Sequence, residues 1–208
     1  MESILPILFN TDMVRAILEG RKTATRRVVK KENVDAVLNS PARKGNPDIS
    51  DKNFINLLIN APYRKGNFLY VRETYCPDYF DHVTQYGNKH AYKADYDDAV
   101  LSSDIPEPKW TPSIHMPKEA ARIWLEVTDV RVEKLQNITI EGIRAEGLSS
   151  MAVHAGDMDI AMQEWQILWD STIKKKALPF YGWDANPWVW VIEFSRCEKP
   201  GGKICTTK

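Results

Sequence analysis

Residues 122–135, RIWLEVTDVRVEKL, constrain the fold most, because the apolar positions change phase within a single strand. These positions are Ile123, Leu125 and Val127, followed one residue out of phase by Val130 and Val132. Successive strand residues point to opposite faces, so a one-residue slip indicates a β-bulge or a sharp bend. Such a bend is typical of a small sheet that curls into a barrel.

Three further segments read as strands. Residues 4–9 contain Pro6, which favours an edge position. The phrase GNFLYVRET is entered through Gly66, and the phrase NPWVWVIEF near the C-terminus places Trp188, Trp190, Ile192 and Phe194 on one face. Together with residues 122–135 they predict a small sheet.

Helical signals lie between these strands. One short helix, with Thr11 as its predicted N-cap, ends at Gly20, and a second, capped by Thr139, ends at Gly147. Residues 157–170 carry apolar side chains at helical spacing. Residues 32–66 are polar and predict irregular structure, and residues 77–120 are rich in proline. We therefore expect an α+β fold with short flanking helices and loop insertions.

The length fits one domain over residues 1–196, with insertions at about 32–62 and 77–120. Residues 197–208, with two adjacent glycines, predict a flexible tail.

Composition excludes several classes of protein. The formal net charge is +0, so no overall field draws the chain to nucleic acid, and any such affinity needs a local basic patch. Three widely separated cysteines and four histidines without paired spacing predict no metal site, and we expect no cofactor. The longest apolar stretch is far below membrane-spanning length. We expect a cytoplasmic protein without a membrane partner.

Tryptophan is abundant near the C-terminus. Five of the seven tryptophans are Trp165, Trp169, Trp183, Trp188 and Trp190. They favour a compact aromatic core, although one or two could stack on nucleic-acid bases.

The densest basic segment is residues 19–31, EGRKTATRRVVKK. It follows a predicted helix instead of preceding one, so it is not a P-loop. In extended form, alternation assigns its side chains to two faces: Arg21, Thr23, Thr25 and Arg27 on one, and Lys22, Ala24 and Arg26 on the other. The segment could be a solvated edge strand, a phosphate-binding patch or the wall of a site in which a lysine is chemically active.

Glu146 is a second informative residue. It stands at the end of a short helix, where the helix dipole disfavours a carboxylate. A nearby cation would offset this cost, and Arg144 is the closest candidate in sequence.

Four phrases in order resemble the ASCH family, whose fold is similar to the PUA domain: ILEGRKTATRR, GNFLYVRETY, IWLEVTDVRVEKLQNITIEGIRAEG and NPWVWVIEF. The phrase WTPSIHMPKEAARIWLEV resembles the longer phage and prophage members. The resemblance covers residues 4–30, 65–76 and 110–195, and implies a small PUA-like β-barrel with flanking helices and a surface cleft.

The resemblance also implies a function, since the family is regarded as binding RNA or nucleosides. Some compact members are amidohydrolases that deacetylate N4-acetylcytidine. Their catalytic lysine, threonine and glutamate fall on Lys22, Thr25 and Glu146 of this sequence. A buried lysine can lose its proton near neutral pH and activate a hydroxyl or a water, and the glutamate could orient it or protonate the leaving amine. Candidate residues for binding substrate or nucleic acid are Arg21, Thr23, Arg26, Arg27, Arg72 and Tyr75.

The sequence departs from the compact enzymes in two respects. The insertions lengthen the chain, and Ala24 and Arg26 replace bulky apolar residues. Three functions therefore stay open. The first is binding of RNA or a modified nucleoside, the second is an N4-acetylcytidine-type amidohydrolase, and the third is a phage accessory protein that acts through protein contacts.

Overall fold

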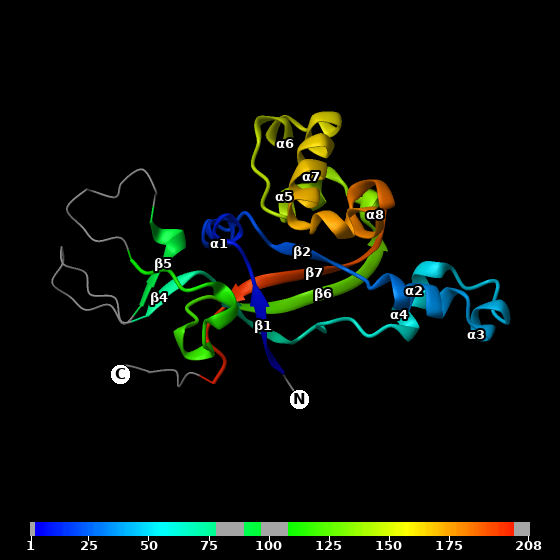
Figure 1. Cartoon of the computed structure of the whole chain (residues 1–208), viewed down its shortest axis with the longest axis horizontal. Coiled ribbons are helices and arrows are strands. Elements are labelled where there is room, and N and C mark those ends of the chain that lie inside the picture. Colours follow the sequence, from blue (N-terminus) through cyan, green and yellow to red (C-terminus); the bar gives the residue numbers. More distant parts are fainter. Residues whose placement is uncertain (1–2, 78–89, 97–107, 202–208) are drawn as a thin grey trace, which may run out of the picture. The chain divides into compact units, whose positions relative to one another are not determined.

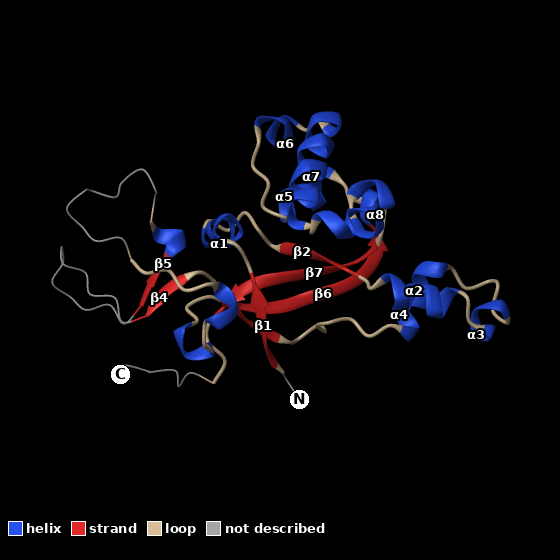
Figure 2. Cartoon of the chain, in the orientation of Figure 1, coloured by secondary structure: helices blue, strands red, loops and turns tan. Residues whose placement is uncertain are grey.

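The structure is a computed structural model, and it describes residues 3–77, 90–96 and 108–201. It has the mixed α+β composition that the sequence predicts (Figures 1 and 2). Main-chain hydrogen bonds join five strands in the order β1-β3-β6-β7-β2, and β4 and β5 form a separate pair. Among the pairings of the described residues none joins β1 to β2, so the predicted closed barrel is not shown.

The chain divides by its internal contacts into two compact units. The first comprises residues 1–20, 66–126 and 195–208, and the second comprises residues 21–65 and 127–194. Two strands cross the division, namely β6 (Trp124–Lys134) and β7 (Trp188–Cys197). Residues 202–208 of the predicted tail lie outside the described residues, as does much of the 77–120 insertion.

In the first unit, β1 (Ile4–Leu8) pairs in parallel with β3 (Phe68–Arg72), which pairs antiparallel with the start of β6. The edge position predicted for residues 4–9 is confirmed, because β1 ends the strand order. Its remaining elements are α1 (Thr11–Leu18), β4 (Tyr75–Pro77), β5 (His90–Tyr92) and three 3₁₀ turns, η1 (Lys93–Asp95), η2 (Ser113–His115) and η3 (Lys118–Ala120). Asn10, one residue before the predicted cap, caps α1.

In the second unit, β2 (Ala24–Val28) pairs antiparallel with β7. Helix α5 (Ile140–Ala145) begins after the predicted cap Thr139, and α7 (Met158–Thr172) occupies the predicted long helix. The other elements after β6 are η4 (Leu135–Asn137), α6 (Met151–Ala155), η5 (Lys175–Ala177), α8 (Leu178–Tyr181) and η6 (Trp183–Ala185). Figure 1 shows α5, α6, α7 and α8 gathered together beside β7 and β2.

The prediction of irregular structure over residues 32–66 is wrong. This segment contains α2 (Lys31–Leu38), α3 (Pro41–Lys44) and α4 (Asp51–Leu58). Ser40 and Ser50 cap the latter two helices, and Phe54 and Ile55 bury one face of α4. Each helix is short, so periodicity alone did not reveal it, whereas the serine caps were a usable signal.

The aromatic core is confirmed for part of the tryptophan set. Trp165 and Trp169 of α7 are buried in a cluster with Ile143, Val189 and Val191. This packing holds α5 and α7 on one face of β7, since Val189 and Val191 lie two residues apart in the strand. It thereby positions the residues that end α5 close to the start of β2.

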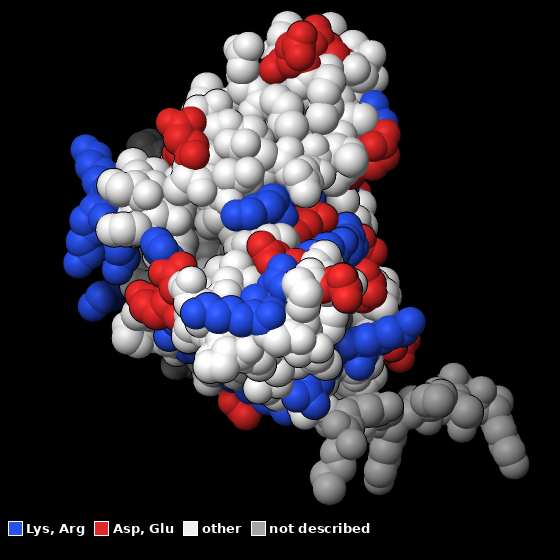
Figure 3. Space-filling model, turned by 90° about the vertical axis from the view of Figure 1, so that its right-hand side faces the viewer, with Lys and Arg blue, Asp and Glu red and all other residues white. Residues whose placement is uncertain are grey.

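Within β6, the buried positions move from Leu125 and Val127 to Val132, in agreement with the predicted change of phase. No helix of the described residues is both long enough and apolar enough to cross a membrane. On the face shown in Figure 3, basic and acidic side chains are interspersed.

Candidate functional site

The site begins where the chain enters β2. The main-chain N–H of Thr23 donates to the carbonyl of Ala145 at the end of α5, at 2.8 Å. Its carbonyl accepts from the N–H of Phe194 in β7, also at 2.8 Å. Lys22 and Glu146 form an isolated antiparallel bridge. The start of β2 is therefore fixed between α5 and β7, and the side chain of Lys22 is held beside Glu146.

Lys22 and Glu146 form a buried ion pair. The Nζ atom of Lys22 lies 2.7 Å from Oε2 of Glu146 and also donates to the main-chain oxygen of that residue at 2.9 Å. The two side chains are 0% and 4% exposed. Two of the three predicted catalytic residues are therefore in direct contact.

Arg26 is the second cation on Glu146. Its Nη1 donates to Oε1 of Glu146 at 3.1 Å, and its Nη2 donates to Glu133 at 2.8 Å. The guanidinium also lies 5.9 Å from the ring centroid of Trp165. Arg144, the cation nearest to Glu146 in sequence, instead donates to the carbonyl of Val153. The carboxylate at the unfavourable helix end is thus offset by two residues that precede it by more than a hundred positions.

Gly142 makes room for this guanidinium. A Cβ atom at position 142 would lie 3.1 Å from Nη2 of Arg26 and 3.0 Å from the side chain of Ile138. The glycine stands inside α5, where it costs about 1 kcal/mol relative to alanine. The close approach of Arg26 explains why the helix carries it.

The charges continue beyond Glu133. Arg131 lies 3.7 Å from Glu133 and 3.2 Å from Asp129, and it also pairs with Glu193 of β7. Cations and anions therefore alternate from Lys22 through Glu146, Arg26 and Glu133 to Arg131. The first three side chains of this series are at most 4% exposed, whereas those of Glu133 and Arg131 are 15% and 37% exposed.

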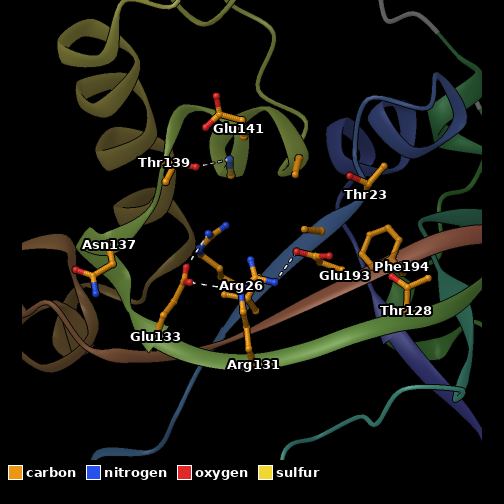
Figure 4. Close-up of a pocket in the computed structure, with 14 residues that line it drawn as sticks. Thr23, Arg26, Thr128, Arg131, Glu133, Asn137, Thr139, Glu141, Glu193 and Phe194 are labelled. Atoms are coloured by element: carbon orange, nitrogen blue, oxygen red, sulfur yellow. Dashed lines mark hydrogen bonds and ion pairs between the residues drawn. The ribbon is translucent and has the colours of Figure 1, made fainter. Parts of the chain in front are cut away.

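A cavity of about 380 Å³ opens beside Arg26 (Figure 4). Its floor includes Ala24 and Val191, and α5 provides one wall through Gly142 and Ala145. The charged lining residues are Arg26, Arg131, Glu133, Glu141 and Glu193, and the uncharged polar ones are Thr23, Thr128, Asn137 and Thr139. With two cations and three carboxylates, the lining favours a ligand that donates hydrogen bonds over a polyanion.

Nε of Arg26 is buried without a hydrogen-bond partner in the described part of the chain. A buried polar atom of this kind costs free energy unless a water or a ligand satisfies it. Arg26 also lines the cavity, so a molecule bound there would contact Arg26 directly and would interact with the Lys22–Glu146 ion pair through it.

Thr25 and Arg27 lie on the opposite face of β2. Thr25 is opposite Ile192 and Arg27 is opposite Trp190, whereas Arg26 is opposite Val191. Directly paired residues share a face and neighbours do not. The alternation predicted for this segment is thus observed within β2, and the cavity of Figure 4 is lined by Arg26 but not by Thr25.

The other candidate residues have different surroundings. Arg21 is exposed and donates to the carbonyl of Gly147, and Thr23 is exposed and lines the cavity. Arg72 and Tyr75 belong to the first unit. There Arg72 donates to the carbonyl of Ile114, and Tyr75 is buried with an edge-to-face contact to His90. The binding roles given to these four residues stay predictions.

Burial sets the protonation properties of this site. Desolvation lowers the pKa of Lys22 below its usual 10.5, and Glu146 opposes this shift in part, while the charges of Arg27 and Arg26 add to it. Desolvation also lowers the pKa of Arg27, again against the attraction of Glu146. A lysine in this state releases its proton more readily than a solvated one, which is what a general base requires.

Sequence reasoning missed Glu133 and Gly142. Glu133 follows directly after the phase change in β6, so it falls on the strand face that Val132 does not occupy. A glycine in the middle of a capped helix is an unfavourable choice by propensity, and that was the available signal for close approach of another group. Among the described residues no group of three or more His, Cys, Asp or Glu could hold a metal ion.

No family model matches the chain, and no curated protein matches it. Among solved structures, the chain is similar to an ASCH domain from Lactobacillus crispatus JV V101, with 11% identity, a TM-score of 0.37, and coverage of 93% of this chain and 79% of that one. It is also similar to protein EF3133 from Enterococcus faecalis V583, which carries the family label DUF984, with 9% identity, a TM-score of 0.41, and coverage of 95% and 77%.

Proposed function

We propose that this protein is an ASCH-type, PUA-like protein that binds RNA or a modified nucleoside, and that the nucleobase enters the cavity of Figure 4. The observation that carries the proposal is the buried Lys22–Glu146–Arg26 cluster beside that cavity. Replacing a buried ion pair by apolar residues is often neutral or stabilising, so such a cluster is a weak device for stability alone. Strongly perturbed groups at a cleft are candidates for function.

The lining of the cavity suits a base with an exocyclic amino or amide group. Carboxylates accept hydrogen bonds from the N4 group of cytosine. Glu133 and Glu193 offer such acceptors, and Asn137 offers both a donor and an acceptor. The volume of about 380 Å³ lies in the range of small-molecule sites.

Calorimetric titration with cytidine, N4-acetylcytidine and uridine tests the proposal. Arg26→Lys keeps the charge but loses the planar fork, and we expect it to weaken binding about 10- to 150-fold, since a lost hydrogen bond to a charged group is worth about 1.5–3 kcal/mol. Arg144→Lys is the matched control, because Arg144 belongs to α5 but does not line the cavity. Absence of binding by all three nucleosides and by RNA would contradict the proposal.

Amide hydrolysis is the second candidate, and the lowered pKa of Lys22 favours it. In this reaction, neutral Lys22 takes a proton from water and the resulting hydroxide adds to the acetyl carbon. The C–N bond then breaks, and the proton passes to the amino group to give cytidine and acetate. The cavity is lined by Arg26 and not by Lys22 or Glu146, which favours binding as the first candidate.

Chromatography of N4-acetylcytidine after incubation with the protein tests hydrolysis. We expect Lys22→Met to abolish turnover. The variant Thr25→Val shows whether the nucleophile is water or the Thr25 hydroxyl. Turnover that persists in this variant identifies water, and turnover that disappears identifies the hydroxyl. Turnover that survives Lys22→Met rules out Lys22 as the base.

A further inference from the structure

The face of the β2–β7 pair opposite the Figure 4 cavity carries a second concave surface. It consists of two adjoining cavities of about 340 and 280 Å³. Both are lined by the same four residues, Ile59, Asn60, Tyr63 and Trp190. Three of the four come from the segment between α4 and β3, and Trp190 comes from β7. We call this surface, residues 59–65 with Arg27, Lys30 and Trp190, the basic groove.

The charge of the basic groove is opposite in sign to that of the first cavity. Its lining has four cations, Arg27, Lys30, Arg64 and Lys65, and one carboxylate, Asp129. That carboxylate already lies 3.2 Å from Arg131. Lys30, Arg64 and Lys65 are exposed, and Arg64 also donates to Oδ1 of Asn60, itself a lining residue, at 3.5 Å. The first cavity has two cations and three carboxylates, so a polyanion is favoured at the basic groove.

Two aromatic side chains, those of Tyr63 and Trp190, line both cavities of the basic groove. Tyr63 is half-buried and interacts electrostatically with Arg27, and Trp190 is 4% exposed and forms the floor. Burial raises the pKa of Tyr63, so its hydroxyl stays protonated at neutral pH and can donate a hydrogen bond. Proteins that bind single strands combine two elements. Cations follow the phosphate backbone, and an aromatic ring stacks on a base.

We propose that the basic groove binds a single-stranded RNA segment, with Lys30, Arg64 and Lys65 on phosphates and Tyr63 stacked on a base. This proposal rests on the proposed function and extends it, because it assigns the RNA backbone to a surface other than the nucleobase cavity. Residues 59–64, which follow α4 and lie outside the sequence phrases that resemble ASCH proteins, supply most of the groove.

Fluorescence anisotropy with a labelled oligouridine of about 12 nucleotides tests the proposal, since single-strand sites cover roughly 4–16 nucleotides. Each phosphate contact contributes about −0.7 to the slope of log K against log salt. The double variant Arg64→Gln/Lys65→Gln should therefore make the slope shallower by about 1.4. The matched control Lys174→Gln/Lys175→Gln removes the same charge at exposed positions outside the groove and should leave the slope within about half of that change.

Substitutions of Tyr63 distinguish the contribution of base stacking to RNA binding from that of charge. Tyr63→Leu should weaken RNA binding about 5- to 150-fold, and Tyr63→Phe should retain most of the affinity, because the ring and not the hydroxyl stacks. Circular dichroism checks that each variant is folded. Equal slopes for the groove variant and its lysine control, or unchanged affinity of Tyr63→Leu, would overturn the proposal.

Competition distinguishes a polymer from a free nucleotide. We expect unlabelled oligouridine to displace the probe at far lower concentration than uridine monophosphate or inorganic phosphate. If oligouridine, uridine monophosphate and inorganic phosphate compete equally well per phosphate group, the proposal of a polymeric ligand is wrong. Failure of the groove is distinguishable from failure of the proposed function, because nucleoside binding that is weakened in Arg26→Lys but unchanged in Arg64→Gln/Lys65→Gln supports the cavity independently.

Discussion

Removal of the Glu146 charge should be the most damaging single change at the ion-pair cluster. Glu146→Gln keeps the shape but removes the carboxylate that lies 2.7 Å from Lys22 and 3.1 Å from Arg26. Breaking a buried pair by removing one partner costs about 3–5 kcal/mol of unfolding free energy, since a charge is left buried. For a chain of this size that corresponds to a fall in Tm of roughly 6–20 °C.

Lys22→Met should cost less than Glu146→Gln. The methionine removes a charge that is expensive to bury, and Glu146 still accepts from Arg26. In the double variant Lys22→Met/Glu146→Gln, Arg26 keeps Glu133 as its partner. The two changes should therefore be non-additive, with a coupling of at least about 1 kcal/mol in a double-mutant cycle.

Urea unfolding followed by tryptophan fluorescence measures these values. The m-value should be the same in all four proteins, so that the shifts report stability. Arg43→Gln/Asp51→Asn is a control pair, because this ion pair between α3 and α4 is more exposed, and its coupling should lie near or below about 1 kcal/mol. Additive effects of Lys22→Met and Glu146→Gln, or a larger cost for Lys22→Met, would refute the reasoning.

Three further outcomes follow from the structure. Burial lowers the pKa of Lys22 in the native chain below its usual 10.5, so just below that pH the unfolded chain binds more protons than the native chain. In urea titrations the unfolding free energy should therefore rise as the pH approaches 10.5, and this rise should vanish in Lys22→Met. Gly45→Ala, where a Cβ meets only ordinary contacts, should stabilise by about 0.4–1 kcal/mol, whereas Gly142→Ala should not, and should weaken nucleoside binding. Arg122→Lys loses the fork that pairs with both oxygens of buried Glu73, and should lower the unfolding free energy by about 1–3 kcal/mol in denaturant titrations.

The sequence was sufficient for features that depend on neighbouring residues. Thr139 as a cap, Glu146 before Gly147 and the alternation of residues 24–27 all follow from local rules, and the structure agrees with each. The phase change in β6 was also visible as a pattern. These features determine where a helix begins and ends and which face of a strand a side chain occupies, because both depend on residues within one or two turns.

Contacts between distant segments could not be obtained in this way. The partners of Glu146 lie 124 and 120 residues earlier, and no periodicity connects them. Local rules favoured Arg144, which is close in sequence but turned toward Val153. The short helices α2–α4 were missed for a related reason, since their stability comes from packing of residues such as Phe54 more than from their own propensity.

The space above Gly142 has a consequence for how this protein can change. A larger residue at position 142 and the present arginine at position 26 compete for the same few ångströms. A substitution at 142 is therefore tolerated more readily after position 26 has become shorter, although this order passes through an intermediate with a vacant space, while the reverse order passes through an intermediate in which the two side chains clash. The two positions form an epistatic pair, so the order of the two mutations decides whether a chain that keeps the cavity of Figure 4 passes through a stable intermediate.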